Sequence, residues 1–105
     1  MSGFVRACAL ADLADGKPHH VDLGDTPVVV VKDRNGVYAL VDECSHASIE
    51  LSEGDVNKGT IECWLHGSRF DLRTGKPLSL PATEPVKVFA TRIDGDDVYV
   101  SLEES

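Results

Sequence analysis

The sequence predicts an all-β protein, with an antiparallel β-sandwich as its base and a small loop-rich lobe inserted into that base. Runs of β-branched residues near both ends are separated by turn residues, whereas Cys, His, Gly, Ser and Pro interrupt the middle of the chain. A chain of 105 residues has room for one hydrophobic core. We therefore expect a single domain over residues 1–105, with its base at about 1–42 and 86–105 and its lobe at about 43–85.

Two hairpins account for most of the expected base. Residues 28–32 and 37–41 are largely apolar and β-branched, and the Asn35-Gly36 pair between them suits the positive φ angles of a tight turn. Near the end of the chain the same pattern surrounds Gly95, with strands expected at 86–93 and 98–102. Alternating valines in these strands indicate that one face of each is buried.

Shorter elements complete the expected secondary structure. Residues 4–10 and 19–23 are predicted as strands, joined by a helical turn at 11–16 that Gly16 ends. In the lobe, short strands are expected at 60–64 and 69–72.

The charge of the chain argues against two classes of partner. Ten basic and 18 acidic residues give a net charge of −8 at pH 7, so phosphate backbones and anionic lipid surfaces repel it. An acidic surface can steer a protein toward a basic face of another protein, or it can serve solubility alone. We expect no nucleic-acid partner and no membrane partner.

No segment has the pattern of secretion or membrane insertion. The first ten residues lack the basic region and the long apolar stretch of a secretory signal. The longest aliphatic run, residues 28–31, is far shorter than the about 20 apolar residues of a membrane span. The protein is expected to be soluble and cytoplasmic.

Two short boxes in the lobe each pair a cysteine with a histidine. Cys44-x-His46 is followed, after sixteen residues, by Cys63-x-x-His66. Such a set suits a binuclear cluster in which one iron takes both thiolates and the other takes both imidazoles. Because this cluster carries less negative charge than one with four thiolates, it accepts an electron more readily.

A tetrahedral zinc site is the main alternative for these four residues. Small domains use zinc bound by two cysteines and two histidines as a structural staple. Zinc motifs usually pair like with like, however, whereas each box here mixes the two residue types. The three cysteines are an odd number, which suits metal binding better than a disulfide framework and leaves Cys8 outside the boxes.

The two boxes resemble the cluster-binding boxes of the Rieske family. Over residues 44–88 the sequence is similar to the Rieske ferredoxins that serve ring-hydroxylating oxygenases, and to relatives encoded beside iron–sulfur assembly proteins. The resemblance implies a Rieske-type β-sandwich base with the cluster lobe at one end. It also implies one [2Fe–2S] cluster, with Cys44, His46, Cys63 and His66 as its metal ligands.

The same resemblance implies roles for residues around the cluster. Gly67 and Ser68 follow the second box directly. Gly67 is expected to let the backbone approach a cluster sulfide, or to serve the turn, and the two roles are compatible. A proline loop centred on Pro81 is expected to cover the cluster, with the edges of the two histidines near solvent.

Three positions depart from the respiratory, high-potential branch of the family. That branch has a disulfide between its boxes, and Ile49 and Leu65 occupy the two cysteine positions here. It also has a serine and a tyrosine whose hydroxyls bond cluster sulfurs; Ser68 remains, but Phe70 replaces the tyrosine. We predict a potential near the negative end of the Rieske span of about −150 to +300 mV.

Other residues with possible chemistry have simpler interpretations. Trp64 is expected to pack within the lobe, with a docking surface as the alternative. His19 and His20 are neighbours in a strand, so they point to opposite faces and cannot chelate together; we expect both at the surface. Cys8 is expected to pack in the core, with redox sensing as the alternative.

The expected function is one-electron transfer, without catalysis by this chain. A flavin-dependent ferredoxin reductase would reduce the cluster, and a terminal oxygenase would take the electron through transient docking near His46, His66 and Pro81. The alternative is a Rieske ferredoxin of iron–sulfur assembly or redox sensing, or the small subunit of a nitrite reductase. A catalytic oxygenase fragment would need a further 2-His-1-carboxylate iron site, for which the chain is too short.

Overall fold

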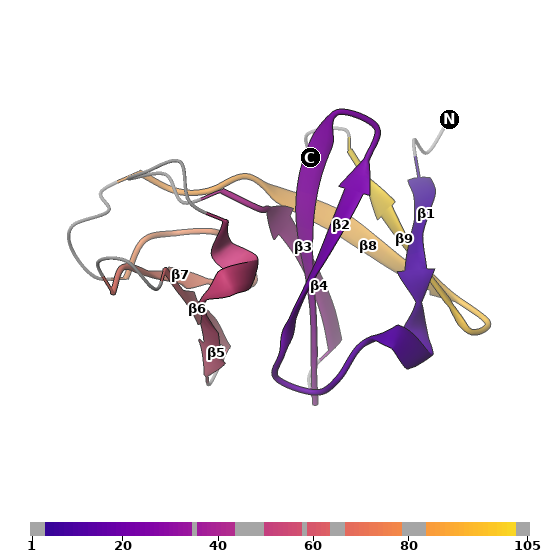
Figure 1. The fold of residues 1–105 in the computed structure, drawn as a ribbon, viewed down its shortest axis with the longest axis horizontal. Helices are drawn as coiled ribbons and strands as arrows, with labels where there is room; N and C mark the ends of the chain where they lie inside the picture. Colours follow the sequence, from indigo (N-terminus) through magenta and orange to yellow (C-terminus); the bar gives the residue numbers. More distant parts are fainter. Residues whose placement is uncertain are drawn as a thin grey trace.

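The computed structural model describes residues 4–34, 36–43, 50–57, 59–63, 67–78 and 84–102. Their strands form two sheets, one of six strands and one of three, which lie at opposite ends of the molecule (Figure 1). The all-β prediction is therefore confirmed. Among these residues, no helix has the length and apolar character needed to cross a membrane.

The six-stranded sheet forms the base, and every neighbouring pair in it is antiparallel. Its order is β1-β9-β8-β4-β3-β2. Its strands are β1 (Phe4–Ala9), β2 (Pro18–Leu23), β3 (Thr26–Asp33), β4 (Gly36–Val41), β8 (Val88–Asp94) and β9 (Asp97–Ser101). Strand β8 changes partner along its length: Val88 and Phe89 pair with β4, whereas the residues from Ala90 onward pair with β9. This change of partner lets the sheet fold over into the two layers of a sandwich.

Both predicted hairpins are present. Strands β3 and β4 pair up to Asp33 and Gly36, and β8 and β9 pair up to Asp94 and Asp97. The predicted helical turn at 11–16 is wrong in its bounds, because a single 3₁₀ turn, η1 (Leu10–Asp12), takes its place. The Asp12 carboxylate accepts a hydrogen bond from the Ala9 amide, so this turn begins and closes early.

The three-stranded sheet lies in the lobe and follows a second 3₁₀ turn, η2 (Leu51–Glu53). Its antiparallel strands are β5 (Asp55–Asn57), β6 (Thr60–Glu62) and β7 (Arg69–Asp71). The sequence predicted β6 and β7 but not β5, which has only one half-buried apolar residue, Val56, between two exposed polar ones. Short edge strands of this kind carry little hydrophobic pattern.

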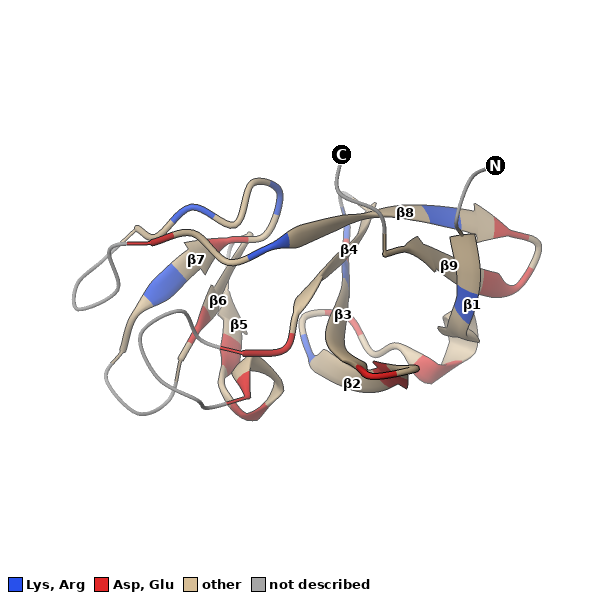
Figure 2. Cartoon of the chain, turned by 90° about the horizontal axis from the view of Figure 1, so that it is seen from above, with Lys and Arg blue, Asp and Glu red and all other residues tan. Residues whose placement is uncertain are grey.

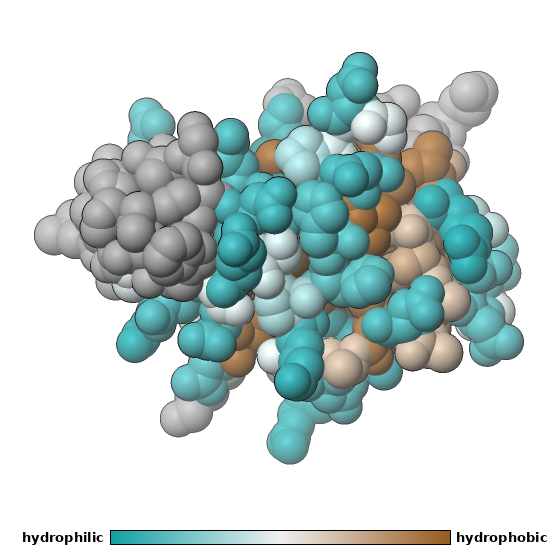
Figure 3. Space-filling model, viewed as in Figure 1, coloured by the Kyte–Doolittle hydropathy of each residue, from teal (hydrophilic) through white to brown (hydrophobic). Residues whose placement is uncertain are grey.

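Strand β3 forms the wall between two hydrophobic cores. Val28 and Val30 face a core inside the base, together with Phe89. Val29 and Val31 face the opposite way, into a core shared with the lobe. Because successive strand residues point to opposite faces, the unbroken valine run indicates a strand that is covered on both sides. Among the coloured residues in Figure 3, hydrophilic side chains predominate, with smaller hydrophobic areas over the base.

Candidate metal centre

The best-described residue of the predicted site is Cys63, which directly follows β6. Ile61 pairs with Phe70 across β6 and β7, and the Cys63 amide donates to the carbonyl of Ser68 at 2.7 Å. Strand alternation therefore turns the side chains of Ile61, Cys63, Ser68 and Phe70 to the same face. All four are buried, at 0–1% exposure, and the Cys63 thiol is free. A buried free thiol beside an inward serine fits a thiolate ligand with a hydroxyl near its sulfur.

Backbone hydrogen bonds tie the two ends of the second box together. Besides the Cys63 amide bond, the Gly67 amide donates to the Cys63 carbonyl at 2.9 Å. Gly67 has a φ of +74°, a left-handed conformation that favours glycine. This geometry supports the turn role, and the approach of the backbone to a cluster sulfide, which is compatible with it, stays a prediction. Trp64, Leu65 and His66 lie outside the described residues.

A buried carboxylate, that of Asp42, lies two residues before the cysteine of the first box. The side chain of Asp42 is 0% exposed. It accepts hydrogen bonds from the Ser52 amide at 2.7 Å, from the Ser52 hydroxyl at 2.6 Å and from Nδ1 of His20 at 2.5 Å. Asp42 and Ser52 flank the segment 44–49, which contains Cys44 and His46 and lies outside the described residues.

His20 bridges two carboxylates. Its Nδ1 faces Asp42, and its Nε2 lies 3.0 Å from the exposed carboxylate of Asp22. Both ring nitrogens can donate at once only when the imidazole is protonated. The hydrogen bond to Asp42 raises the pKa of His20, the bond to Asp22 raises it further, and partial burial opposes both. The interpretation of His20 as a plain surface histidine therefore missed its partner, which no local pattern in the sequence reveals.

The groups around His20 do not form a second metal site in this arrangement. One ligand atom each of His20, Asp42 and Glu50 lie within 4.8 Å of one another. A metal ion at about 2.0–2.2 Å from a nitrogen and an oxygen holds those atoms roughly 3 Å apart or more. The Nδ1–Oδ2 separation of 2.5 Å is therefore that of a hydrogen bond with a proton between the atoms.

This hydrogen bond predicts a pH dependence of stability. The pKa of His20 is higher in the folded chain than its ordinary value of 6.5, so the protonated ring stabilises the fold. That contribution is complete below about pH 6.5 and disappears as the pH rises through the raised pKa. We expect the free energy of unfolding, measured by urea titration, to fall over this interval. A His20→Leu variant should lack this step, whereas an unchanged pH profile in that variant would rule the assignment out.

The structure describes only part of the predicted site. Cys44, His46, His66 and Pro81, together with Ile49, lie outside the described residues. Leu78, which precedes the predicted proline loop, is 54% exposed, and its amide donates to the Arg69 carbonyl. Among the predicted site residues, the structure thus brings together Cys63, Gly67 and Ser68 and leaves the complete ligand set as a prediction.

Cys8 lies far from the lobe, in the core of the base. It is 5% exposed and packs in the same cluster as Val28, Phe89 and Val98. Burial, and secondarily the nearby charge of Asp12, raises the pKa of its thiol above 9.0. A buried thiol with a raised pKa is a poor nucleophile, so the structure favours packing over redox sensing.

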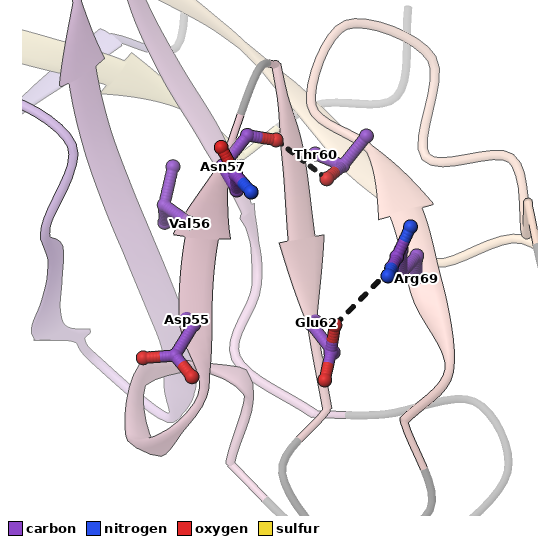
Figure 4. A pocket seen from close by; sticks show the side chains of 6 residues that line it. All are labelled: Asp55, Val56, Asn57, Thr60, Glu62 and Arg69. Atoms are coloured by element: carbon purple, nitrogen blue, oxygen red, sulfur yellow. Dashed lines mark hydrogen bonds and ion pairs between the residues drawn. The ribbon is translucent and has the colours of Figure 1, made fainter.

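A hollow on the outer face of the lobe is unrelated to Cys63. It is lined by polar side chains of β5, β6 and β7, and by Val56, which also packs against the core shared with β3 (Figure 4). Arg69 forms an exposed ion pair with Glu62 at 3.1 Å, and the Thr60 hydroxyl donates to the Asn57 carbonyl. Because Thr60 and Glu62 alternate with the buried Ile61 and Cys63, this polar hollow lies on the opposite face of the sheet from the thiol.

The position of Phe70 allows a direct test of the predicted low potential. Phe70 is diagonal to Cys63 across two strands, a spacing that aromatic side chains can bridge. A Phe70→Tyr variant should place a hydroxyl near the cysteine sulfur and raise the potential. A net gain of about 0.5–1.5 kcal/mol for one hydrogen bond corresponds to roughly 20–65 mV in a redox titration. Phe89→Tyr, in the core of the base, is the matched control; equal potentials in the two variants would contradict the prediction.

The described residues thus form an all-β base with a small lobe, and the inner face of the lobe presents the buried free thiol of Cys63. Residues 3–90 match the Rieske [2Fe–2S] domain, and the chain belongs to this family. The predicted family and fold are thereby confirmed, and with them the expectation of an iron–sulfur cluster.

Known relatives and solved structures agree with this assignment. The chain is 40% identical, over 95% of its length and 94% of the relative's, to the ferredoxin component of biphenyl 2,3-dioxygenase of Rhodococcus jostii strain RHA1. It is 38% identical to the ferredoxin of carbazole 1,9a-dioxygenase from Nocardioides aromaticivorans IC177, with a TM-score of 0.92 over 97% of this chain and 100% of that one. A ferredoxin-bound oxygenase structure of carbazole 1,9a-dioxygenase also matches, with 34% identity and a TM-score of 0.91 over 100% and 98% of the two chains. The relatives are named as ferredoxin components, not as catalytic subunits.

Proposed function

We propose that this protein carries single electrons to a terminal oxygenase, on a [2Fe–2S] cluster bound by Cys44, His46, Cys63 and His66. The observation that carries the proposal is the free, buried thiol of Cys63, on the same inner face as Ser68, in a chain of the Rieske family. The cluster supplies a site that takes up and releases one electron. The two cysteines would hold one iron and the two histidines the other.

The described residues of the lobe would set the surroundings of the cluster. Ile61, Phe70 and Leu72 form an apolar wall around Cys63, and this wall excludes water from the thiolate. Ser68 would donate a hydrogen bond to a sulfur from the buried face of the sheet. Phe70 offers no hydroxyl, which supports a potential near the low end of the Rieske span.

The proposed electron donor is a flavin-dependent ferredoxin reductase, and the proposed acceptor is the terminal oxygenase. The relatives are ferredoxin components of biphenyl and carbazole dioxygenases, and one matching structure is a complex of reduced oxygenase with oxidised ferredoxin. Docking would be transient and centred on the tip of the lobe, near His46, His66 and Pro81. Acidic residues on both the base and the lobe (Figure 2) would favour a basic partner face.

Two further expectations belong to the same proposal. The chain would act as one domain, because the base and the lobe share the core on one side of β3. It would work in the cytoplasm, a reducing compartment that suits the free thiols of Cys8 and Cys63.

Electron delivery can be tested by rapid mixing. The reduced protein, followed by its visible absorbance, should be oxidised on mixing with a substrate-loaded terminal oxygenase of the biphenyl or carbazole class, and reduced again by a flavin reductase with NADH. A His66→Ala variant is the negative control. A wild-type cluster that no oxygenase of these classes oxidises, but that transfers electrons to or from iron–sulfur assembly proteins, would favour the assembly alternative instead.

A further inference from the structure

We propose that His20 is a positioning residue for the first cluster-binding loop, acting through Asp42 and Ser52. The inference rests on the proposed function, because it assumes that Cys44 and His46 are ligands. His20 belongs to the base, on β2, whereas Asp42 and Ser52 flank the ligand segment. Their hydrogen bonds would thus connect a strand of the base to both ends of that loop.

The pair of Asp42 and Ser52 closes the loop at its base. The two residues are ten positions apart, yet two hydrogen bonds join them, one from the Ser52 amide and one from its hydroxyl. Ser52 lies in η2, whose first residue, Leu51, is fully buried in the core shared with β3. The chain that leaves at Asp42 and the chain that returns at Ser52 are therefore held against each other.

Asp42 is itself fixed to the base sheet. Its amide donates to the Pro27 carbonyl on β3 at 3.0 Å, directly after the end of β4. Its carboxylate has no exposed surface, so both oxygens depend on protein donors. Oδ1 receives the Ser52 amide, and Oδ2 receives both the Ser52 hydroxyl and the His20 ring.

Strand register explains why His20 can reach this carboxylate and His19 cannot. His20 pairs with Val29, which faces the lobe, whereas His19 pairs with Val30, which faces the interior of the base. Paired residues in an antiparallel sheet point to the same face. His20 therefore lies on the lobe side of the sheet, and His19 offers a neighbouring histidine on the other side.

Removing His20 would leave a buried carboxylate with one donor fewer. Buried charges are retained only where hydrogen bonds compensate them, so the carboxylate would draw in water or shift position. Either response would weaken the hydrogen bonds between Asp42 and Ser52. The two ends of the loop would then be held together less firmly. Mutating a residue that helps to hold metal ligands in place typically lowers metal affinity by about 10- to 100-fold.

The experiment compares three variants. His20→Leu removes the donor, whereas His20→Asn keeps an amide nitrogen that can replace Nδ1. His19→Leu is the matched control. Hydrogen–deuterium exchange reports on the Ser52 amide, and chelator-induced bleaching of the cluster reports on the loop. In His20→Leu we expect faster exchange at Ser52 and a bleaching rate about tenfold higher than in the wild type. Exchange in β9 should rise only as far as the loss of global unfolding free energy requires, and by a smaller factor than exchange at Ser52. His20→Asn and His19→Leu should keep wild-type exchange at Ser52 and wild-type cluster retention.

Two results would overturn the proposal. One is a His20→Leu protein with wild-type exchange at Ser52 and wild-type cluster retention. The other is exchange that rises by the same factor in β9 as at Ser52, because His20 would then act on the loop only through the stability of the whole fold. Ser52→Ala, which removes only the hydroxyl donor, should show a smaller rise at the same site. A wild-type protein that binds no cluster would refute the proposed function itself, a result distinct from either of these.

Discussion

Replacing Cys63 with alanine should give a protein that retains no iron–sulfur cluster. Cys63 supplies a buried thiol at the inner face of the lobe, and alanine has no atom that can bind iron. Without one of two thiolates, the iron bound by both would lose half of its protein ligands. We expect the visible absorbance of the cluster, and the bound iron and sulfide, to fall to background in the purified variant.

Cys8→Ala is the matched control for this change. Cys8 is as free and nearly as buried as Cys63, but it packs in the core of the base. Its substitution leaves a small cavity, which costs on the order of 1 kcal/mol of stability, and should leave the cluster content unchanged. A Cys63→Ala protein with full iron and sulfide, or equal loss in both variants, would contradict the assignment of Cys63.

Gly75→Ala should destabilise the lobe more than any ordinary surface substitution. Gly75 has a φ of +76°, and a Cβ placed there would lie 2.1 Å from the Val86 carbonyl oxygen and 2.7 Å from Cγ2 of Val88. The Val86 amide also donates to the Gly75 carbonyl, so this is where the lobe meets the chain that returns to the base. The left-handed conformation costs about 1–2 kcal/mol for alanine, and the clash adds about 1–3 kcal/mol.

The free energy of unfolding, measured by urea titration, should therefore fall by about 2–5 kcal/mol, a large part of the about 5–15 kcal/mol of a typical domain. Gly59→Ala separates the two causes, because Gly59 has a φ of +78° but no atom within 4 Å of the added Cβ. The Gly59→Ala variant should lose only about 1–2 kcal/mol of unfolding free energy, the cost of the left-handed conformation for alanine. Equal losses of unfolding free energy in the two variants would contradict the predicted clash between a Cβ at position 75 and the Val86 carbonyl oxygen.

The base of the fold could be predicted because its strands carry their own signals. The valine run at 28–31 and the Asn35-Gly36 turn specify the central hairpin without help from distant residues. The short strand β5 carries no such signal, since its pairing with β6 depends on tertiary contact. The bounds of η1 likewise depend on a hydrogen bond from the Ala9 amide to the Asp12 side chain, which composition alone does not reveal.

The functional site, like the fold, has one part that the sequence predicts and another that it does not. The boxes around Cys44 and Cys63 are local patterns with specific spacing, and they predicted the family that the comparisons establish. The contact between His20 and Asp42 joins residues 22 positions apart, across β3, and no spacing rule links them. Sequence reasoning identifies chemically reactive residues well, but the residues that hold them in place become visible only once strand register brings them together.

The most direct test of the central claim is the metal content and paramagnetic resonance spectrum of the purified protein. The Rieske assignment predicts two irons and two acid-labile sulfides per chain, with a resonance signal that appears on reduction by one electron. It also predicts that mutation of His66 to alanine removes this signal. One zinc ion per chain, with no sulfide and no signal on reduction, would contradict it.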